Sequence, residues 1–168
     1  MNEHTINTTP HERHIVLVAP EVHWNTGNAG RTCLGYDAHL HLIKPLSFSL
    51  DDKHLKRAGL DYWSEVNLHV WDNFEALIEE FQPTDEEIAL LTTRGQQPLW
   101  NITPAKRMFL IFGSETKGLP GEIHDRYSGR AFRIPTNNDI RCLNLSTSVG
   151  IALYESLRGL LYSPMKQI

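Results

Sequence analysis

Short apolar runs alternate with helix-like segments along most of the chain, and this alternation constrains the fold more than any other feature. The runs cover residues 14–19, 39–43, 67–71, 88–92, 108–112 and 131–134. Their lengths and their content of branched apolar residues are typical of buried strands. Six strands that alternate with helices indicate an α/β sandwich with a mostly parallel sheet. Ligands of such sheets bind at the carboxyl ends of the strands.

Caps and helical spacing predict the helices between these strands. One helix begins near Asn28, behind a glycine-containing loop. Asp72 or Asn73 caps a second helix over residues 74–81, and a short helix covers residues 120–127. A basic helical turn is expected over residues 51–58 and a loop over residues 94–104.

The most informative segment runs from residue 133 to residue 161, where a strand, a polar loop and a long helix follow one another. Asn144 or Ser146 can cap this helix. The helix turns inward four apolar residues at helical spacing, which are Val149, Leu153, Leu157 and Leu160. A polar loop at a helix N-terminus favours a polar or anionic ligand, whereas the alternative reading is an ordinary well-capped turn.

Two further strand ends carry unusual polar loops, at residues 26–31 and 113–119. Neither loop has the glycine pattern of a dinucleotide-binding turn or of a P-loop, so dehydrogenase and NTPase readings lose support. Ser114 lacks the GxSxG elbow of an α/β hydrolase. His39 and His41 alternate along a strand without a third ligand at a diagnostic spacing; we read them as a half-exposed edge and assign no metal.

The chain is long enough for one domain, which we place at residues 14–162 behind a flexible tail of residues 1–13. That tail lacks the apolar core of a signal peptide, and no run is long enough to span a membrane. The cysteines Cys33 and Cys142 have no paired spacing, so we expect a reduced, cytoplasmic protein. The net charge of −4 argues against nucleic-acid binding through bulk charge alone. Basic residues nevertheless gather near the predicted turns; they form either a local basic face or a solvated surface.

Three segments taken together resemble the ordered motifs of the SPOUT RNA methyltransferases, in their SpoU class. They are NTGNAGRTC at residues 25–33, FGSETKGLP at residues 112–120 and RIPTNNDIRCLNLSTS at residues 133–148. The connector at residues 44–63 is similar to that of the small single-domain branch that methylates the ribose of the tRNA wobble nucleotide. The resemblance therefore spans nearly all of the chain from residue 14 to residue 161.

This resemblance implies a C-terminal deep trefoil knot, S-adenosylmethionine as cofactor, and a homodimer whose sites are completed across the interface. It implies a cofactor pocket made by Leu91, Gly113, Ile134, Cys142 and Leu143. It implies a catalytic group made by Asn25, Arg31, Glu115 and Asn144. Where the family usually has serine in an SLN or SMN triplet, this chain has Cys142, whose thiol is a weaker hydrogen-bond donor.

The implied reaction is methyl transfer to the 2'-hydroxyl of the wobble pyrimidine in the anticodon stem-loop of a tRNA. Because a guanidinium stays protonated, Arg31 suits the adjacent phosphate better than the role of general base. We expect RNA contacts from Arg31, Lys53, Lys56, Arg57, Arg94 and Arg141. Two alternatives stay open: a catalytically weak RNA-binding protein of the same fold, suggested by Cys142, and a 2'-O-methyltransferase that acts on ribosomal RNA.

Overall fold

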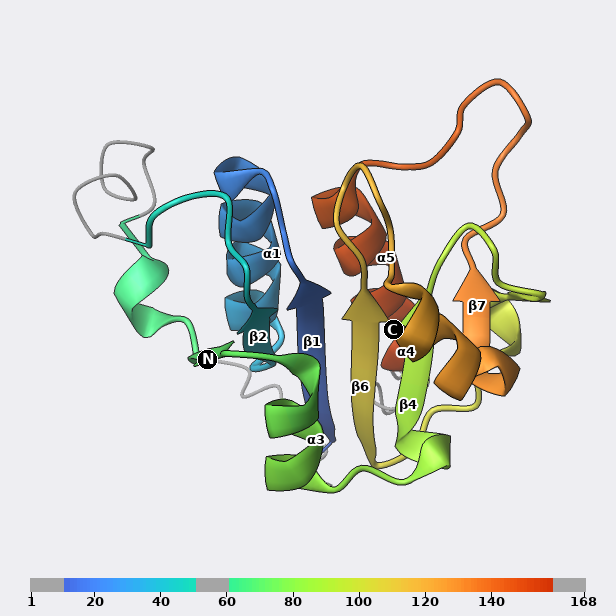
Figure 1. Cartoon of the computed structure of the whole chain (residues 1–168), viewed down its shortest axis with the longest axis horizontal. Helices are drawn as coiled ribbons and strands as arrows, with labels where there is room; N and C mark the ends of the chain where they lie inside the picture. The colour runs from blue at the N-terminus through green and yellow to red at the C-terminus, as the bar shows by residue number, and fades with distance from the viewer. Residues whose placement is uncertain (1–10, 51–60, 159–168) are drawn as a thin grey trace, which may run out of the picture.

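One parallel sheet organises the molecule (Figure 1). The computed structural model describes residues 11–50 and 61–158 of the 168-residue chain. Within them, seven strands are ordered β3-β2-β1-β6-β4-β7-β5, and all pairings between neighbours are parallel. The strands are β1 (Glu12–Val18), β2 (His39–Ile43), β3 (Leu68–Trp71), β4 (Ile88–Leu91), β5 (Gln97–Pro98), β6 (Arg107–Phe112) and β7 (Ala131–Arg133). The predicted α/β fold with a mostly parallel sheet is confirmed.

Helices cover both faces of this sheet, as a parallel sheet requires (Figure 1). The described α-helices are α1 (His23–Gly35), α3 (Phe74–Phe81), α4 (Gly121–Arg126) and α5 (Leu145–Ser156). Short 3-10 turns lie at Trp63–Glu65, Asp85–Glu87, Leu99–Asn101 and Ser128–Arg130. No helix in the described part of the chain is both long and apolar enough to cross a bilayer.

Two apolar cores lie on opposite faces of the sheet because side chains alternate along each strand. On one face, Ile15 and Leu17 of β1 belong to the same cluster as Cys33 of α1 and Leu153 of α5. On the other face, Val16 and Val18 belong to a cluster with α3 and α4. The predicted inward positions Val149, Leu153 and Leu157 are buried, whereas Leu160 and the helical turn at 51–58 lie outside the described residues.

Three boundaries differ from the sequence prediction. Helix α1 begins at His23, more than a turn before Asn28, and strand β1 begins at Glu12. The segment 94–104, predicted as a loop, contains the two-residue strand β5, which pairs with β7 at Phe132 and Arg133. A proline is tolerated there because β5 is an edge strand that needs no donor on its outer side.

The histidines of β2 do not form the half-exposed edge that the sequence suggested. Strand β2 lies between β1 and β3, and His41 is fully buried. The Trp71 indole donates to His41 Nδ1 at 3.0 Å, His41 Nε2 lies 2.8 Å from His14 Nδ1, and His14 Nε2 lies 2.8 Å from a Glu12 carboxylate oxygen. One tautomer of each neutral ring satisfies this whole chain, with His41 and His14 both protonated on Nε2.

Strands β1 and β2 bring His39 within ligand reach of His14 and His41, which raises the question of a metal. The rings of His14 and His39 are stacked, 4.6 Å apart and 15° from parallel, so their in-plane lone pairs run side by side instead of converging. Both nitrogens of His41 also have hydrogen-bond partners. The cluster is therefore explained as a polar network on the sheet without a metal ligand set.

Acid should destabilise the protein through these two rings. Burial lowers the pKa of His14 to about 4 and that of His41 to about 2, below the ordinary value near 6.5. Below pH 6.5 the unfolded chain therefore binds protons that the folded chain refuses, so stability falls as pH falls. Between pH 7 and pH 5 we expect each ring to lower the free energy of unfolding by about 2 kcal/mol.

Urea unfolding at several pH values measures this loss. His23→Gln, a change to a histidine outside the cluster, should show the same pH dependence as the wild type. A free energy of unfolding that stays constant from pH 7 to pH 5 would contradict the neutral assignment.

Candidate active site

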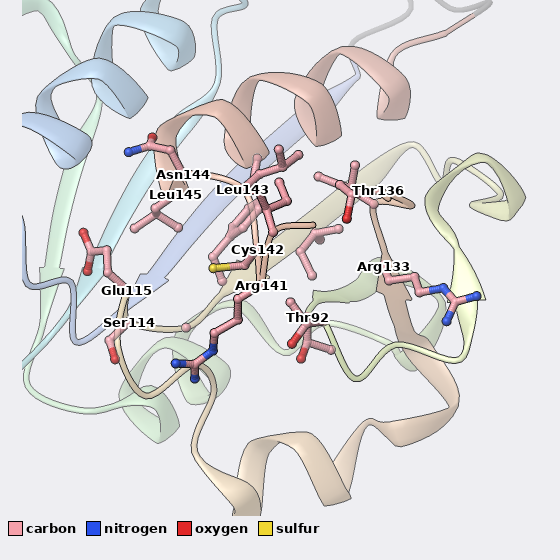
Figure 2. A pocket seen from close by; sticks show the side chains of 18 of the residues that line it. Thr92, Ser114, Glu115, Arg133, Thr136, Arg141, Cys142, Leu143, Asn144 and Leu145 are labelled. Atoms are coloured by element: carbon pink, nitrogen blue, oxygen red, sulfur yellow. The ribbon is translucent and has the colours of Figure 1, made fainter. Parts of the chain in front are cut away.

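A cavity of about 1130 Å³ opens at the carboxyl edge of the sheet, where the loops after β4, β6 and β7 meet the start of α1. Its lining combines apolar side chains such as Leu91 and Ile134 with polar ones such as Asn25, Glu115 and Asn144. Figure 2 shows Glu115 and Asn144 near each other at one end of the cavity and Arg133 at the other end. The three loops that the sequence singled out therefore meet in one place.

The loop after β6 is a tight turn that depends on glycine. The amide of Ser114 donates to the carbonyl of Gly118 at 3.2 Å, and the amide of Gly118 donates back to Ser114 at 3.0 Å. A Cβ on Gly113 would overlap the backbone of Gly118 and Leu119, and Gly118 itself has a φ of +70°. Only glycine fits both positions, so the backbone at the cavity wall is fixed by sterics.

Glu115 projects from this turn and caps α1 from a distance. Its carboxylate accepts hydrogen bonds from the backbone amides of Glu21 (2.8 Å) and Val22 (3.2 Å) and from the Asn25 side chain (3.0 Å). The cap residue of α1 supplies no side-chain bond of its own. A carboxylate at this position satisfies free amides and complements the helix dipole. This distant cap explains why the helix begins before Asn28.

Asn144 joins the same network from the third loop. Its side-chain oxygen caps α5 by accepting from the amides of Ser146 (2.9 Å) and Thr147 (3.3 Å), which confirms one of the two predicted caps. Its amide nitrogen donates to the Asn25 side-chain oxygen at 2.9 Å. Glu115, Asn25 and Asn144 thus form a continuous hydrogen-bonded chain that ties the N-termini of α1 and α5 to the turn after β6.

A second carboxylate braces the same two loops in the opposite direction. Glu21 accepts from the backbone amide of Thr116 at 3.0 Å and from its hydroxyl at 2.7 Å. Glu115 and Glu21 therefore each bind the loop that carries the other. This reciprocal arrangement holds the polar end of the cavity in one geometry.

Most residues predicted for the site line this cavity. All five residues proposed for the cofactor pocket do so, as do three of the four proposed catalytic residues and two of the proposed RNA contacts. They are Leu91, Gly113, Ile134, Cys142, Leu143, Asn25, Glu115, Asn144, Arg94 and Arg141. Cys142 is exposed, and its sulfur carries no disulfide. Lys53, Lys56 and Arg57 lie outside the described residues.

Among the predicted site residues that the structure describes, Arg31 alone does not line the cavity. It is exposed on the third turn of α1, because the helix begins at His23, and not on the first turn as the sequence suggested. Its guanidinium carbon lies 5.7 Å from the centre of the Tyr62 ring, and the Tyr62 hydroxyl donates to the Gly27 carbonyl at 3.0 Å.

Several cavity residues were not among the predicted site residues. Trp24, Thr92, Lys117 and Arg133 all line the cavity. Trp24 could have been predicted as a site residue, because it is a large aromatic residue directly before Asn25 in a polar segment. Thr92 and Arg133 lie at the ends of predicted strands, and Lys117 lies in the loop at residues 113–119, so the strand-end rule could have found them.

A parallel α/β sheet whose polar loops meet in a cavity at its carboxyl edge defines the class of α/β proteins that bind a ligand at this edge. Comparison with protein families narrows this class, because residues 12–154 match the SpoU rRNA Methylase family. The chain belongs to that family.

Relatives agree with this assignment. The tRNA (cytidine(34)-2'-O)-methyltransferase of Burkholderia cenocepacia is 40% identical over 145 residues, covering 86% of this chain and 93% of the relative. A structure described as giving insights into the 2-OH methylation of C/U34 on tRNA matches with a TM-score of 0.80 and 39% identity, covering 90% of this chain and 97% of its own. An AdoMet-bound rRNA methyltransferase from Sinorhizobium meliloti matches with a TM-score of 0.78 and 25% identity, covering 90% of this chain and 57% of its own.

Proposed function

We propose that the protein is a tRNA (cytidine/uridine-34)-2'-O-methyltransferase that uses S-adenosylmethionine. The observation that carries the proposal is the hydrogen-bonded chain of Glu115, Asn25 and Asn144 at the polar end of the cavity. It joins all three loops that resemble the SpoU motifs. The names of the relatives support the wobble nucleotide of tRNA as the substrate. We place the enzyme in the cytoplasm, where it would meet tRNA.

The lining of the cavity is chemically suited to the cofactor. Leu91, Ile134 and Leu143 offer an apolar surface for a purine ring. The turn at Gly113 places backbone in the cavity wall, because a Cβ at Gly113 would overlap the backbone of Gly118 and Leu119. When bound, S-adenosylmethionine supplies an electrophilic methyl group on a sulfonium. Cys142 lies at the cavity wall, where its thiol is a weaker donor than the hydroxyl usual in this family.

Alignment is the main task of the chain's own residues. The amides of Asn25 and Asn144 are held from both sides, by Glu115 and by the amides of α5, so their orientation is fixed before the ribose arrives. Such preorganisation accelerates a displacement by placing the 2'-hydroxyl in line for attack. Arg31 holds the adjacent phosphate and favours the ionised hydroxyl, and the proton leaves through a neighbouring group or water.

The family likeness also supports a trefoil knot in the C-terminal segment. Strand β7 lies beyond β4 in the sheet, whereas α5 packs against α1, β1 and β6. The loop between β7 and α5 therefore returns across the carboxyl edge of the sheet. A knot would place this return inside the loops that line the cavity.

A homodimer would bring Arg31 to a cavity. The neighbouring helices α1 and α5 expose apolar side chains, with Ile151 and Tyr154 on α5 and Tyr36 just after α1. The rings of Tyr36 and Tyr154 lie 6.5 Å apart, so these side chains form one patch. We assign this patch to the contact between protomers, with Arg31 serving the cavity of the partner.

Methyl transfer tests the function directly. The protein is incubated with methyl-labelled S-adenosylmethionine and tRNA that lacks the modification, and nuclease digestion with mass spectrometry locates the label. A 2'-O-methyl group on nucleotide 34 is the expected result. Methylation of ribosomal RNA alone would show that ribosomal RNA, and not tRNA, is the substrate. Tight tRNA binding without any methyl transfer would show that the protein is an RNA-binding protein and not an active methyltransferase.

RNA affinity should fall steeply with salt, because cations around the cavity would contact phosphates. Arg94, Lys117, Arg133 and Arg141 line it. With about four phosphate contacts to a single-stranded loop, the dissociation constant should rise by about 50-fold between 50 and 200 mM salt. Fluorescence anisotropy with a labelled anticodon stem-loop measures this change.

Arg141→Gln should reduce the salt dependence, whereas the control Lys106→Gln, at the opposite edge of the sheet, should not. A dissociation constant that is independent of salt would show that these residues do not contact phosphates.

A further inference from the structure

Trp24 is an exposed tryptophan at the polar end of the cavity. Its side chain is 61% exposed and lines the cavity directly before Asn25 in the first turn of α1. Asn25 in turn contacts Glu115 and Asn144. Trp24 therefore adjoins, in the chain and in the cavity lining, a residue proposed to align the ribose.

Neighbouring rings support the indole. The His23 ring packs edge-on to it, with centroids 4.7 Å apart and 69° between the planes. Phe48 lies behind His23, with centroids 6.5 Å apart. An aromatic group backed in this way offers a firm surface at the mouth of the cavity.

We propose that Trp24 is a stacking platform for the base of the nucleotide that is methylated. This inference rests on the proposed function and adds a ligand subsite to it. Proteins that recognise a nucleotide in an RNA loop commonly take up its unstacked base, and an unstacked base gains free energy on an aromatic ring. Stacking is tolerant of base identity, which suits a site that accepts both cytidine and uridine.

Charge around the cavity agrees with an RNA strand as the occupant. Lys117 lies in the same lining, on the turn that carries Glu115, and Arg141 lies on the third loop. Cations beside an exposed aromatic ring are the usual composition of a groove for single-stranded nucleic acid.

Two variants of Trp24 test the platform. Trp24→Ala should weaken binding of an anticodon stem-loop by about tenfold, since stacking on one ring contributes roughly that much. Trp24→Phe, which keeps a ring, should retain most of the affinity. Trp100→Ala is the matched control, because Trp100 is 59% exposed but is absent from the cavity lining, and its affinity should stay within about twofold of wild type.

A stem-loop with an abasic ribose at position 34 identifies the base concerned. With this RNA, wild type and Trp24→Ala should bind equally, because the stacking partner is missing from both complexes. If the abasic site must be at a neighbouring position to remove the difference, or if Trp24→Ala binds intact RNA as well as wild type does, the proposal is wrong.

Three readouts in the same preparations separate the competing explanations. The affinity for S-adenosylmethionine, measured by calorimetry, and the mass of the protein in solution should be unchanged in Trp24→Ala. Loss of cofactor affinity would assign the indole to the cofactor, and a change of mass would assign it to a protein contact; either outcome overturns the platform. Absence of methyl transfer by the wild type would overturn the proposed function itself, whereas transfer with an unaffected Trp24→Ala would overturn the platform alone.

Discussion

Glu115→Gln is expected to lower the rate of methyl transfer by about 100-fold in a protein that still folds. Three donors converge on the Glu115 carboxylate, two from the backbone before α1 and one from Asn25. An amide of the same size keeps one acceptor oxygen and turns its NH₂ group toward a donor. At least one bond is lost, the start of α1 shifts, and Asn25 no longer meets Asn144 in the aligned geometry.

Single-turnover methylation of tRNA measures this effect, and urea unfolding should show a loss of about 2 kcal/mol in the free energy of unfolding, the usual size for hydrogen bonds to a charged group. Glu122→Gln is the matched control, because Glu122 is an exposed acid on the helix that follows the same loop. It should leave the rate of methyl transfer unchanged and lower the free energy of unfolding by less than about 1 kcal/mol, the usual effect of removing an acid from the first turn of a helix. Full activity of Glu115→Gln would show that the distant cap of α1 is irrelevant to the chemistry.

Arg31→Lys should be nearly inactive, because it keeps the charge but loses the planar fork that binds a phosphate through two donors. Its folding should be unaffected, since Arg31 is exposed and its contact within the described part of the chain is the weak one to the Tyr62 ring. Methyl transfer under saturating cofactor measures the loss. Recovery of most of the wild-type turnover would count against a bidentate contact.

Mixed forms of the proposed homodimer test which protomer Arg31 serves. Asn144→Asp is the second variant, because its carboxylate can still cap α5 but offers no donor to Asn25. Each homodimer should be inactive. A heterodimer of Arg31→Lys and Asn144→Asp, purified with two tags, should regain about half of the wild-type activity if Arg31 acts on the partner's cavity, because one of the two sites is then intact. An inactive heterodimer would place Arg31 in the site of its own chain.

The sequence predicted what depends on local patterns. Apolar runs located six of the described strands, and Asn73 and Asn144 are caps as expected. The three polar loops follow strand ends of a parallel sheet, so their meeting in one cavity follows from the fold class. Resemblance then supplied residues such as Leu91 and Ile134, which carry no polar signal of their own.

The differences arise where a distant group replaces a local signal. Helix α1 begins early because Glu115, more than 90 residues along the chain from Glu21, caps it. The burial of His41 depends on its position between two strands and on a partner, Trp71, in β3. No window of neighbouring residues contains either relation, so periodicity and propensity could not reveal them.

The position of β1 in the sheet has a consequence for protein synthesis. This strand leaves the ribosome among the first described residues, yet its neighbour β6 is made much later, and the buried guanidinium of Arg13 donates to the side chain and the carbonyl of Ser156 at the end of α5. Until Ser156 emerges, burial of this guanidinium would leave some of its donors without acceptors, which is costly for a charged group. The nascent chain therefore cannot complete its fold stepwise from the N-terminus, and we expect stable structure to form only near the end of translation.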